Sequence, residues 1–245
     1  MIVCEIGLNH LGDPNYGEEY IEKIIESKSD GITFQIREND YYSKKEHSHL
    51  LLSDSFYQKI SEKIHDAGLK FGIAIAEESK IDFFNSINVD FYKILSWDLN
   101  NFSLIDKLCN TGKPIFVSTG MGSLDEISKF VQHVSSSKNQ FSLIHTQLSH
   151  SLDEVNLKAI ATLKTKFDLP VSYGNHALNM NTIYASIGFE PSDIFLYVKG
   201  NHDIKHPDDE HALNLNDLPE LILNIHELYV ALGTGKKQKM DKKIK

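Results

Sequence analysis

The sequence lacks the features of a membrane-embedded or exported protein. No apolar run in its 245 residues reaches the roughly 18 residues that a transmembrane helix requires. No basic region precedes the first apolar stretch, so we expect no signal peptide. The two cysteines, Cys4 and Cys109, fall in a predicted strand and a predicted helix, which favours buried free thiols in a reducing cytoplasm. No Gly/Ser-rich or Pro-rich linker divides the chain, so we expect one main domain.

Negatively charged residues outnumber positively charged ones, 34 to 25, and the end of the chain is rich in lysine. The formal net charge is −9, which argues against a nucleic-acid partner because such binding depends on neutralising phosphates. The segment 236–245 carries six lysines and little that packs, so residues 234–245 are expected to form a disordered tail rather than a membrane-binding or RNA-binding arm.

Short runs rich in Val, Ile and Phe alternate with longer stretches of helical period. The pattern predicts strands at residues 2–8, 31–36, 70–76, 91–96, 114–120, 141–147, 170–175 and 194–200. It predicts helices at residues 15–29, 54–67, 79–88, 101–111, 124–137, 155–167, 179–188 and 217–232. Eight such units in about 250 residues are typical of an α/β protein with a (β/α)8 TIM barrel, here residues 1–233.

A doubly wound sheet is the alternative fold. It would normally carry a Gly-rich phosphate turn after its first strand, and the segment 7–12, Gly-Leu-Asn-His-Leu-Gly, does not fit GxGxxG. The barrel is therefore preferred.

Polar side chains follow several predicted strands directly. Glu5, Lys93, His145 and His176 lie at or just beyond strand ends, and Ser96 follows Lys93 closely. The carboxyl ends of barrel strands meet at one mouth, where barrel enzymes place their chemistry. We therefore expect these five side chains around one mouth, with His145 among the catalytic residues. The long loops 37–53 and 201–216 are expected to form lids or substrate contacts there.

The segments EIGLNHLGD, DFYKILSWDLNNFSLIDKLCNTGKPIFVSTGMGSLDEI and LPELILNIHELYVALG resemble the N-acetylneuraminate (sialic acid) synthase family. The resemblance implies a (β/α)8 barrel that condenses phosphoenolpyruvate with an N-acylated amino sugar to give a nonulosonic acid. It implies a phosphoenolpyruvate-dependent, C–C bond-forming transferase of carbohydrate biosynthesis. Many members add a C-terminal antifreeze-like domain that completes the partner's site in a homodimer, and we expect no such domain within this sequence.

The resemblance also assigns roles to residues. Lys93 and Ser96 match the phosphate-side lysine and serine, and His176 matches one of two histidines that hold a divalent metal, Mn²⁺ or Mg²⁺. The remaining matches are expected to act in catalysis or to bind substrate: Glu5, His10 and Gln35 for catalysis, and Asn9, Thr119, Asn175 and His211 for substrate.

The sequence departs from the family pattern at several of these positions. A family lysine is Thr33 here, and a family serine is Gly174. The second metal histidine is expected on the last strand, where the segment 195–200 has none, so His202 is the candidate, with Arg37 and Lys199 as compensating cations. Three hypotheses follow: a divergent nonulosonic acid synthase, a related barrel with a changed substrate, or a non-catalytic sugar- or anion-binding barrel.

Overall fold

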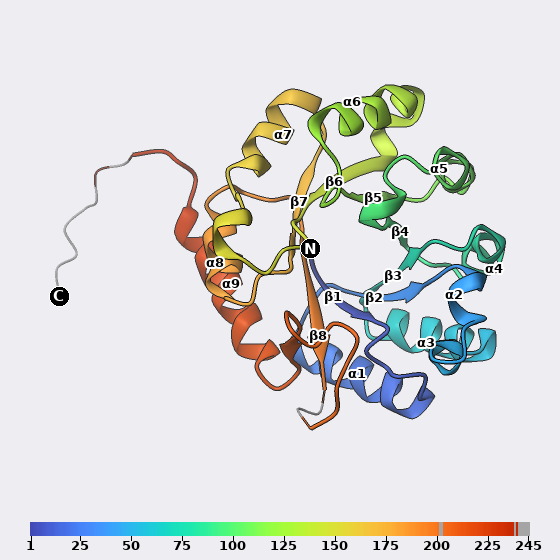
Figure 1. The fold of residues 1–245 in the computed structure, drawn as a ribbon. Coiled ribbons are helices and arrows are strands. Elements are labelled where there is room, and N and C mark those ends of the chain that lie inside the picture. The colour runs from blue at the N-terminus through green and yellow to red at the C-terminus, as the bar shows by residue number, and fades with distance from the viewer. Residues whose placement is uncertain (201–202, 238, 240–245) are drawn as a thin grey trace.

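The computed structural model describes residues 1–200, 203–237 and 239. Eight parallel strands follow one another around a closed barrel, because the last strand pairs with the first (Figure 1). Their bounds are β1 (Ile2–Gly7), β2 (Gly31–Ile36), β3 (Lys70–Ile75), β4 (Phe91–Ile94), β5 (Ile115–Ser118), β6 (Phe141–His145), β7 (Val171–Asn175) and β8 (Ile194–Lys199). The predicted (β/α)8 TIM barrel is confirmed.

Helices surround the strands on the outside of the barrel (Figure 1). They are α1 (Pro14–Ser27), α2 (Asn39–Tyr42), α3 (Asp54–Asp66), α4 (Ile81–Ser86), α5 (Phe102–Cys109), α6 (Leu124–His133), α7 (Ala159–Phe167), α8 (Asn181–Ile187) and α9 (Leu218–Leu232). No helix among the described residues has the length and apolar character needed to cross a membrane.

The predicted strands agree with the structure to within two residues at each end. Helix α6 is shorter than predicted, because the serine-rich segment after it forms a 3-10 helix, η4 (Ser135–Gln140), and serine is a weaker helix former than alanine or leucine. Helix α7 also begins four residues late, after the 3-10 helix η5 (Leu152–Glu154). Helix α2 and the short strand β9 (Leu213–Asn214) lie in the two segments predicted to be long loops.

Strand alternation divides the apolar side chains between the helix layer and the barrel interior. Ile2, Cys4 and Ile6 pack in the cluster shared with the helices, whereas Val3 between them belongs to a separate interior cluster. Cys4 is buried and Cys109 is partly exposed, and both are free thiols.

Three phenylalanines fill the barrel interior. The ring centroids of Phe91 and Phe116 lie 5.2 Å apart, and those of Phe116 and Phe195 lie 5.0 Å apart. Gly72 on β3 makes room for them, since a Cβ there would stand 2.2 Å from the ring of Phe91. The barrel is therefore a packed core that closes the floor beneath one mouth.

Candidate active site

A cavity of about 250 Å³ opens at the carboxyl ends of the strands. Its polar lining comes from five strand ends or the segments after them: Gln35, Arg37, Lys93, Ser96, Ser118, His176 and Asp208. Its apolar and aromatic lining is Leu8, Tyr41, Leu95, Trp97, Leu148, Tyr197 and Pro207. The predicted mouth residues Lys93, Ser96 and His176 thus share one cavity.

Lys93 of β4, which lines this cavity, forms a buried ion pair with Glu5 of β1. The Lys93 ammonium donates a hydrogen bond to Glu5 Oε2 across the barrel, and only 5% and 4% of the two side chains are exposed. The ammonium also lies 5.7 Å from the ring centroid of Phe195 and 5.5 Å from that of Tyr197. A cation is thereby held just above the apolar floor, with its charge balanced by one carboxylate.

The rim of the cavity carries a second cation. The guanidinium carbon of Arg37 lies 4.2 Å from the ring centroid of Tyr41 and 4.8 Å from that of Trp97. Arg37 also pairs with Glu38 at 2.9 Å. We call Arg37, Tyr41 and Trp97 the Arg37 clamp. Because Trp97 is 45% exposed, the clamp presents an aromatic face and a cation to a ligand entering the mouth.

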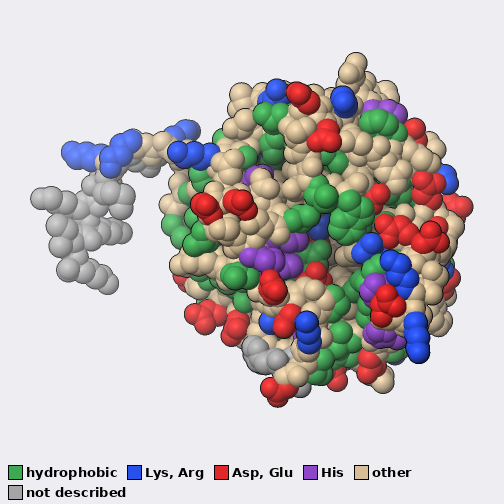
Figure 2. Space-filling model, in the orientation of Figure 1, with side chains coloured by type: hydrophobic (Ala, Val, Ile, Leu, Met, Phe, Trp, Pro, Cys, Tyr) green, Lys and Arg blue, Asp and Glu red, His purple; other side chains and the backbone are tan. Residues whose placement is uncertain are grey.

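Three histidines form a stack beside the cavity. The ring of His211 lies between those of His176 and His150, with centroids 4.4 Å and 5.3 Å away. His150 Nδ1 donates to the backbone oxygen of His176 at 2.7 Å, and its Nε2 lies 3.1 Å from Glu210 Oε2. Histidine side chains gather near the middle of the face drawn in Figure 2, beside exposed hydrophobic ones.

Burial dominates the titration of two of these rings. It lowers the pKa of His176 to about 2 and that of His211 to about 4, and the positive charge of Lys93 acts in the same direction. Both rings are therefore neutral at physiological pH.

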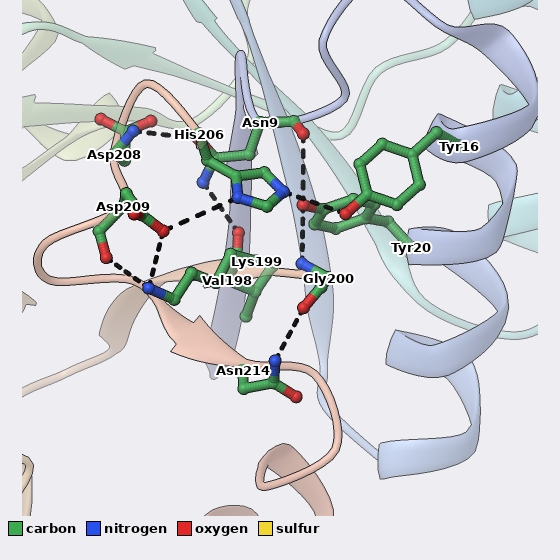
Figure 3. A network of polar contacts seen from close by, with 10 residues as sticks. All are labelled: Asn9, Tyr16, Tyr20, Val198, Lys199, Gly200, His206, Asp208, Asp209 and Asn214. Atoms are coloured by element: carbon green, nitrogen blue, oxygen red, sulfur yellow. Dashed lines mark hydrogen bonds and ion pairs between the residues drawn. The ribbon is translucent and has the colours of Figure 1, made fainter. Parts of the chain in front are cut away.

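Residues 203–217, between β8 and α9, contact the residues that follow β1 and the end of β8 (Figure 3). The Asp208 amide donates to Asn9 Oδ1 at 3.0 Å, and Asn9 Nδ2 donates to the Val198 oxygen at 2.9 Å. The Lys199 ammonium donates to the carbonyl oxygen and to Oδ1 of Asp209, at 2.6 and 2.7 Å. These bonds set the carboxyl of Asp208 in the cavity wall.

Four other predicted site residues are bound within the loops and the helix layer. His145 follows the interior residue Ile144, so its ring faces the helices, where Nε2 bonds to the Val155 oxygen at 2.9 Å. His10 accepts the Gly12 amide on Nδ1, and Thr119 donates to the Ile144 oxygen. Asn175 accepts hydrogen bonds from the hydroxyls of Tyr173 and Thr182 and donates to Ala177: these contacts order the start of α8. Asn9, described above, also acts through a loop contact.

The profile of the NeuB family matches residues 19–237, nearly the whole barrel. The chain belongs to the NeuB family. The resemblance drawn from its motifs is thereby confirmed.

Several relatives of this chain are named as synthases of nonulosonic acids. N-acetylneuraminate-9-phosphate synthase of Homo sapiens is 26% identical over 259 residues, covering 97% of this chain and 72% of that protein. N,N'-diacetyllegionaminic acid synthase of Legionella pneumophila is 26% identical, covering 99% of this chain and 76% of its own length. An uncharacterised protein of Methanocaldococcus jannaschii is 30% identical over 96% of this chain and 73% of its own length. These matches support a nonulosonic acid synthase-like function.

Solved structures agree on the fold. The N-acetylneuraminic acid synthetase of Leptospira borgpetersenii, in complex with citrate, superposes with a TM-score of 0.90 at 23% identity, covering 98% of this chain and 87% of that chain.

The described residues of this NeuB barrel do not fit a divalent metal. Among them, no three His, Cys, Asp or Glu side chains are grouped so as to hold an ion. His176 and His211 stack with an interplanar angle of 21°, so their nitrogens do not converge on one point. Lys199 binds Asp209 instead of leaving space for an ion, and His202 lies outside the described residues.

We therefore expect Mn²⁺ to bind the wild-type protein weakly. The neutral His176 ring, held in the stack, offers an ion one nitrogen, and the positive charge of the nearby Lys93 ammonium repels the ion. A stable metal site needs several fixed ligands. Titration of Mn²⁺ followed by calorimetry measures the affinity, with His176→Ala and His202→Ala as the variants. Tight binding that survives His202→Ala would contradict this expectation.

Sequence reasoning missed several residues that form the NeuB cavity. Trp97, Tyr197 and Asp208 line the cavity, and none of them is among the site residues expected from the sequence. Asp208 falls in the long loop 201–216. The signal that points to it is the length of that loop at the carboxyl end of a barrel strand.

Proposed function

We propose that this protein condenses phosphoenolpyruvate with the aldehyde of an N-acylated amino sugar and releases inorganic phosphate. The observation that carries the proposal is the buried Lys93–Glu5 pair at the base of a cavity that Ser96 and Ser118 also line. A small, multiply charged anion needs a desolvated cation together with hydroxyl donors, and NeuB-family membership makes phosphoenolpyruvate the anion to test.

Lys93 is suited to this role because its charge is already held in place. Its ammonium has three donors, and Glu5 occupies one of them. No described residue accepts a hydrogen bond from the other two, so they can meet phosphate or carboxylate oxygens. Glu5 keeps the site from carrying an uncompensated buried charge before the anion arrives. Ser96 then supplies a directional donor.

The reaction joins C3 of phosphoenolpyruvate to the aldehyde carbon. As that bond forms, positive charge develops at C2, and water adds there. Loss of phosphate from the resulting tetrahedral carbon gives the keto acid. The cavity residues orient the two substrates for this step: Lys93 and Ser96 hold the anion, while Gln35 and the Arg37 clamp face the acceptor.

A second candidate is an anion-binding barrel without catalysis. The observation that favours it is the ion pair of Lys199 with Asp209, on the strand where the resemblance places a metal-binding histidine. Such a protein would bind phosphoenolpyruvate and release no phosphate.

Ser96→Ala is expected to lower kcat/KM for phosphoenolpyruvate by about 10- to 100-fold, because a hydrogen bond to a charged group contributes about 1.5–3 kcal/mol. Phosphate release from phosphoenolpyruvate is measured with a panel of N-acylated amino sugars, free and phosphorylated. Ser128→Ala, an exposed hydroxyl on α6, is the matched control and should behave as wild type. Absence of phosphate release with every sugar, despite binding of phosphoenolpyruvate, would support the second candidate.

A further inference from the structure

The carboxyl of Asp208 takes no part in the hydrogen bonds that hold its segment in place. It lines the cavity, and an oxygen of its carboxyl would stand 3.0 Å from a Cβ built on Gly7, so it reaches over the end of β1. Among the described residues, none donates a hydrogen bond to this carboxyl.

The carboxyl pKa values of Asp208 and of the neighbouring Asp209 shift in opposite directions. Asp209 receives the Lys199 ammonium at 2.7 Å, which lowers the pKa of its carboxyl. Burial raises the pKa of Asp208 to about 7, and the negative charge of Glu5 adds to the effect while Lys93 opposes it. At neutral pH, Asp208 is thus divided between its acid and its carboxylate, as a proton-transfer group requires.

The backbone of this segment is fixed so that the carboxyl keeps its place. The amide of Asp208 donates to Asn9, and the Tyr16 hydroxyl lies 2.9 Å from His206 Nε2. Figure 3 shows both contacts. The anchoring contacts use the Asp208 amide and the side chains of its neighbours. The carboxyl of Asp208 remains for the cavity.

We propose that Asp208 is the catalytic acid of the condensation and protonates the acceptor's aldehyde oxygen. This role rests on the proposed function. The electron pair of the phosphoenolpyruvate double bond forms the new C–C bond, and the carbonyl pair moves to oxygen, which takes the Asp208 proton. Water then adds to C2 and returns a proton to Asp208. The C2–O bond to phosphate breaks, the ketone forms, and the remaining hydroxyl proton leaves with the phosphate.

The decisive measurement is the pH dependence of kcat. An acid must be protonated to act, so kcat of the wild type should fall as the pH rises through and above about 7. Asp208→Asn should lower kcat by about 100-fold or more and remove this alkaline fall, and Asp208→Glu should restore part of both. Asp209→Asn is the matched control: it weakens the anchor of the segment but should keep the alkaline fall.

The outcomes separate this role from the proposed function. No phosphate release by the wild type overturns both. Phosphate release with the same pH profile in wild type and Asp208→Asn overturns the role of Asp208 alone, whatever the absolute rate.

A titration of the wild type covers the case in which Asp208→Asn does not fold. With ¹³C-labelled aspartate carboxyls, one resonance should titrate near 7, and it should disappear in Asp208→Glu labelled in the same way. If every labelled carboxyl of the wild type titrated in the ordinary acidic range, the role would be overturned.

Discussion

Lys93→Ala is expected to remove measurable binding of phosphoenolpyruvate and to lower the free energy of unfolding by about 3–5 kcal/mol. The variant loses the buried cation of the cavity and leaves the Glu5 carboxylate buried without its partner. A calorimetric titration measures the binding, and denaturant unfolding measures the stability. Equal heats for wild type and Lys93→Ala would refute the assignment of the anion site.

Two further variants separate charge from stability. Lys70→Ala removes a lysine of the neighbouring strand that is 56% exposed in its pair with Asp90, so it should cost about 1 kcal/mol or less and leave binding intact. The double variant Glu5→Gln with Lys93→Met replaces the buried pair by neutral groups. It should recover most of the lost stability and none of the binding. Recovery of binding in the double variant would show that Lys93 does not hold the anion.

Phe116→Ala is expected to lower the free energy of unfolding by about 3–5 kcal/mol. Its ring packs edge-to-face on both Phe91 and Phe195, in the middle of the barrel floor, where the surrounding strands cannot collapse into the space. Phe102→Ala, which removes a partly buried ring stacked on His133, should cost about 1 kcal/mol and serves as the control. Denaturant unfolding measures both. If both variants lowered the free energy of unfolding by similar amounts, the interior rings would not stabilise the barrel as expected.

The order of the strands could be predicted from the sequence because each strand is a short apolar run followed by a polar residue. The same pattern correctly brought Lys93, Ser96 and His176 to one cavity, since parallel strands all end at the same mouth.

The face on which each side chain lies was harder to predict. Strand β6 reads Phe-Ser-Leu-Ile-His, with apolar residues on both faces, because barrel strands are buried against the interior and against the helices alike. Alternation therefore did not reveal that His145 lies on the helix side.

The loop residues depend on contacts between distant parts of the chain. Asp208 is placed by Asn9, 199 residues earlier, and His150 by the carbonyl of His176, just after β7. No local pattern encodes such a pairing. The stacking of the three histidines and the place of the Asp208 carboxyl in the cavity wall therefore follow from the fold and not from a local sequence pattern.

The seam between β1 and β8 has a consequence for how the protein is made. Asn9 forms hydrogen bonds with both Val198 and Asp208, at sequence separations of 189 and 199 residues. The residues after β1 therefore cannot complete their contacts until β8 and the segment after it have been made. Contacts of such long range form slowly, and until they form the edges of β1 and of the growing sheet lie open to other chains. Before β8 and the segment after it have left the ribosome, the cavity lacks Tyr197 and Asp208. We therefore expect ligand binding during synthesis to appear in one late step, once residue 208 has emerged.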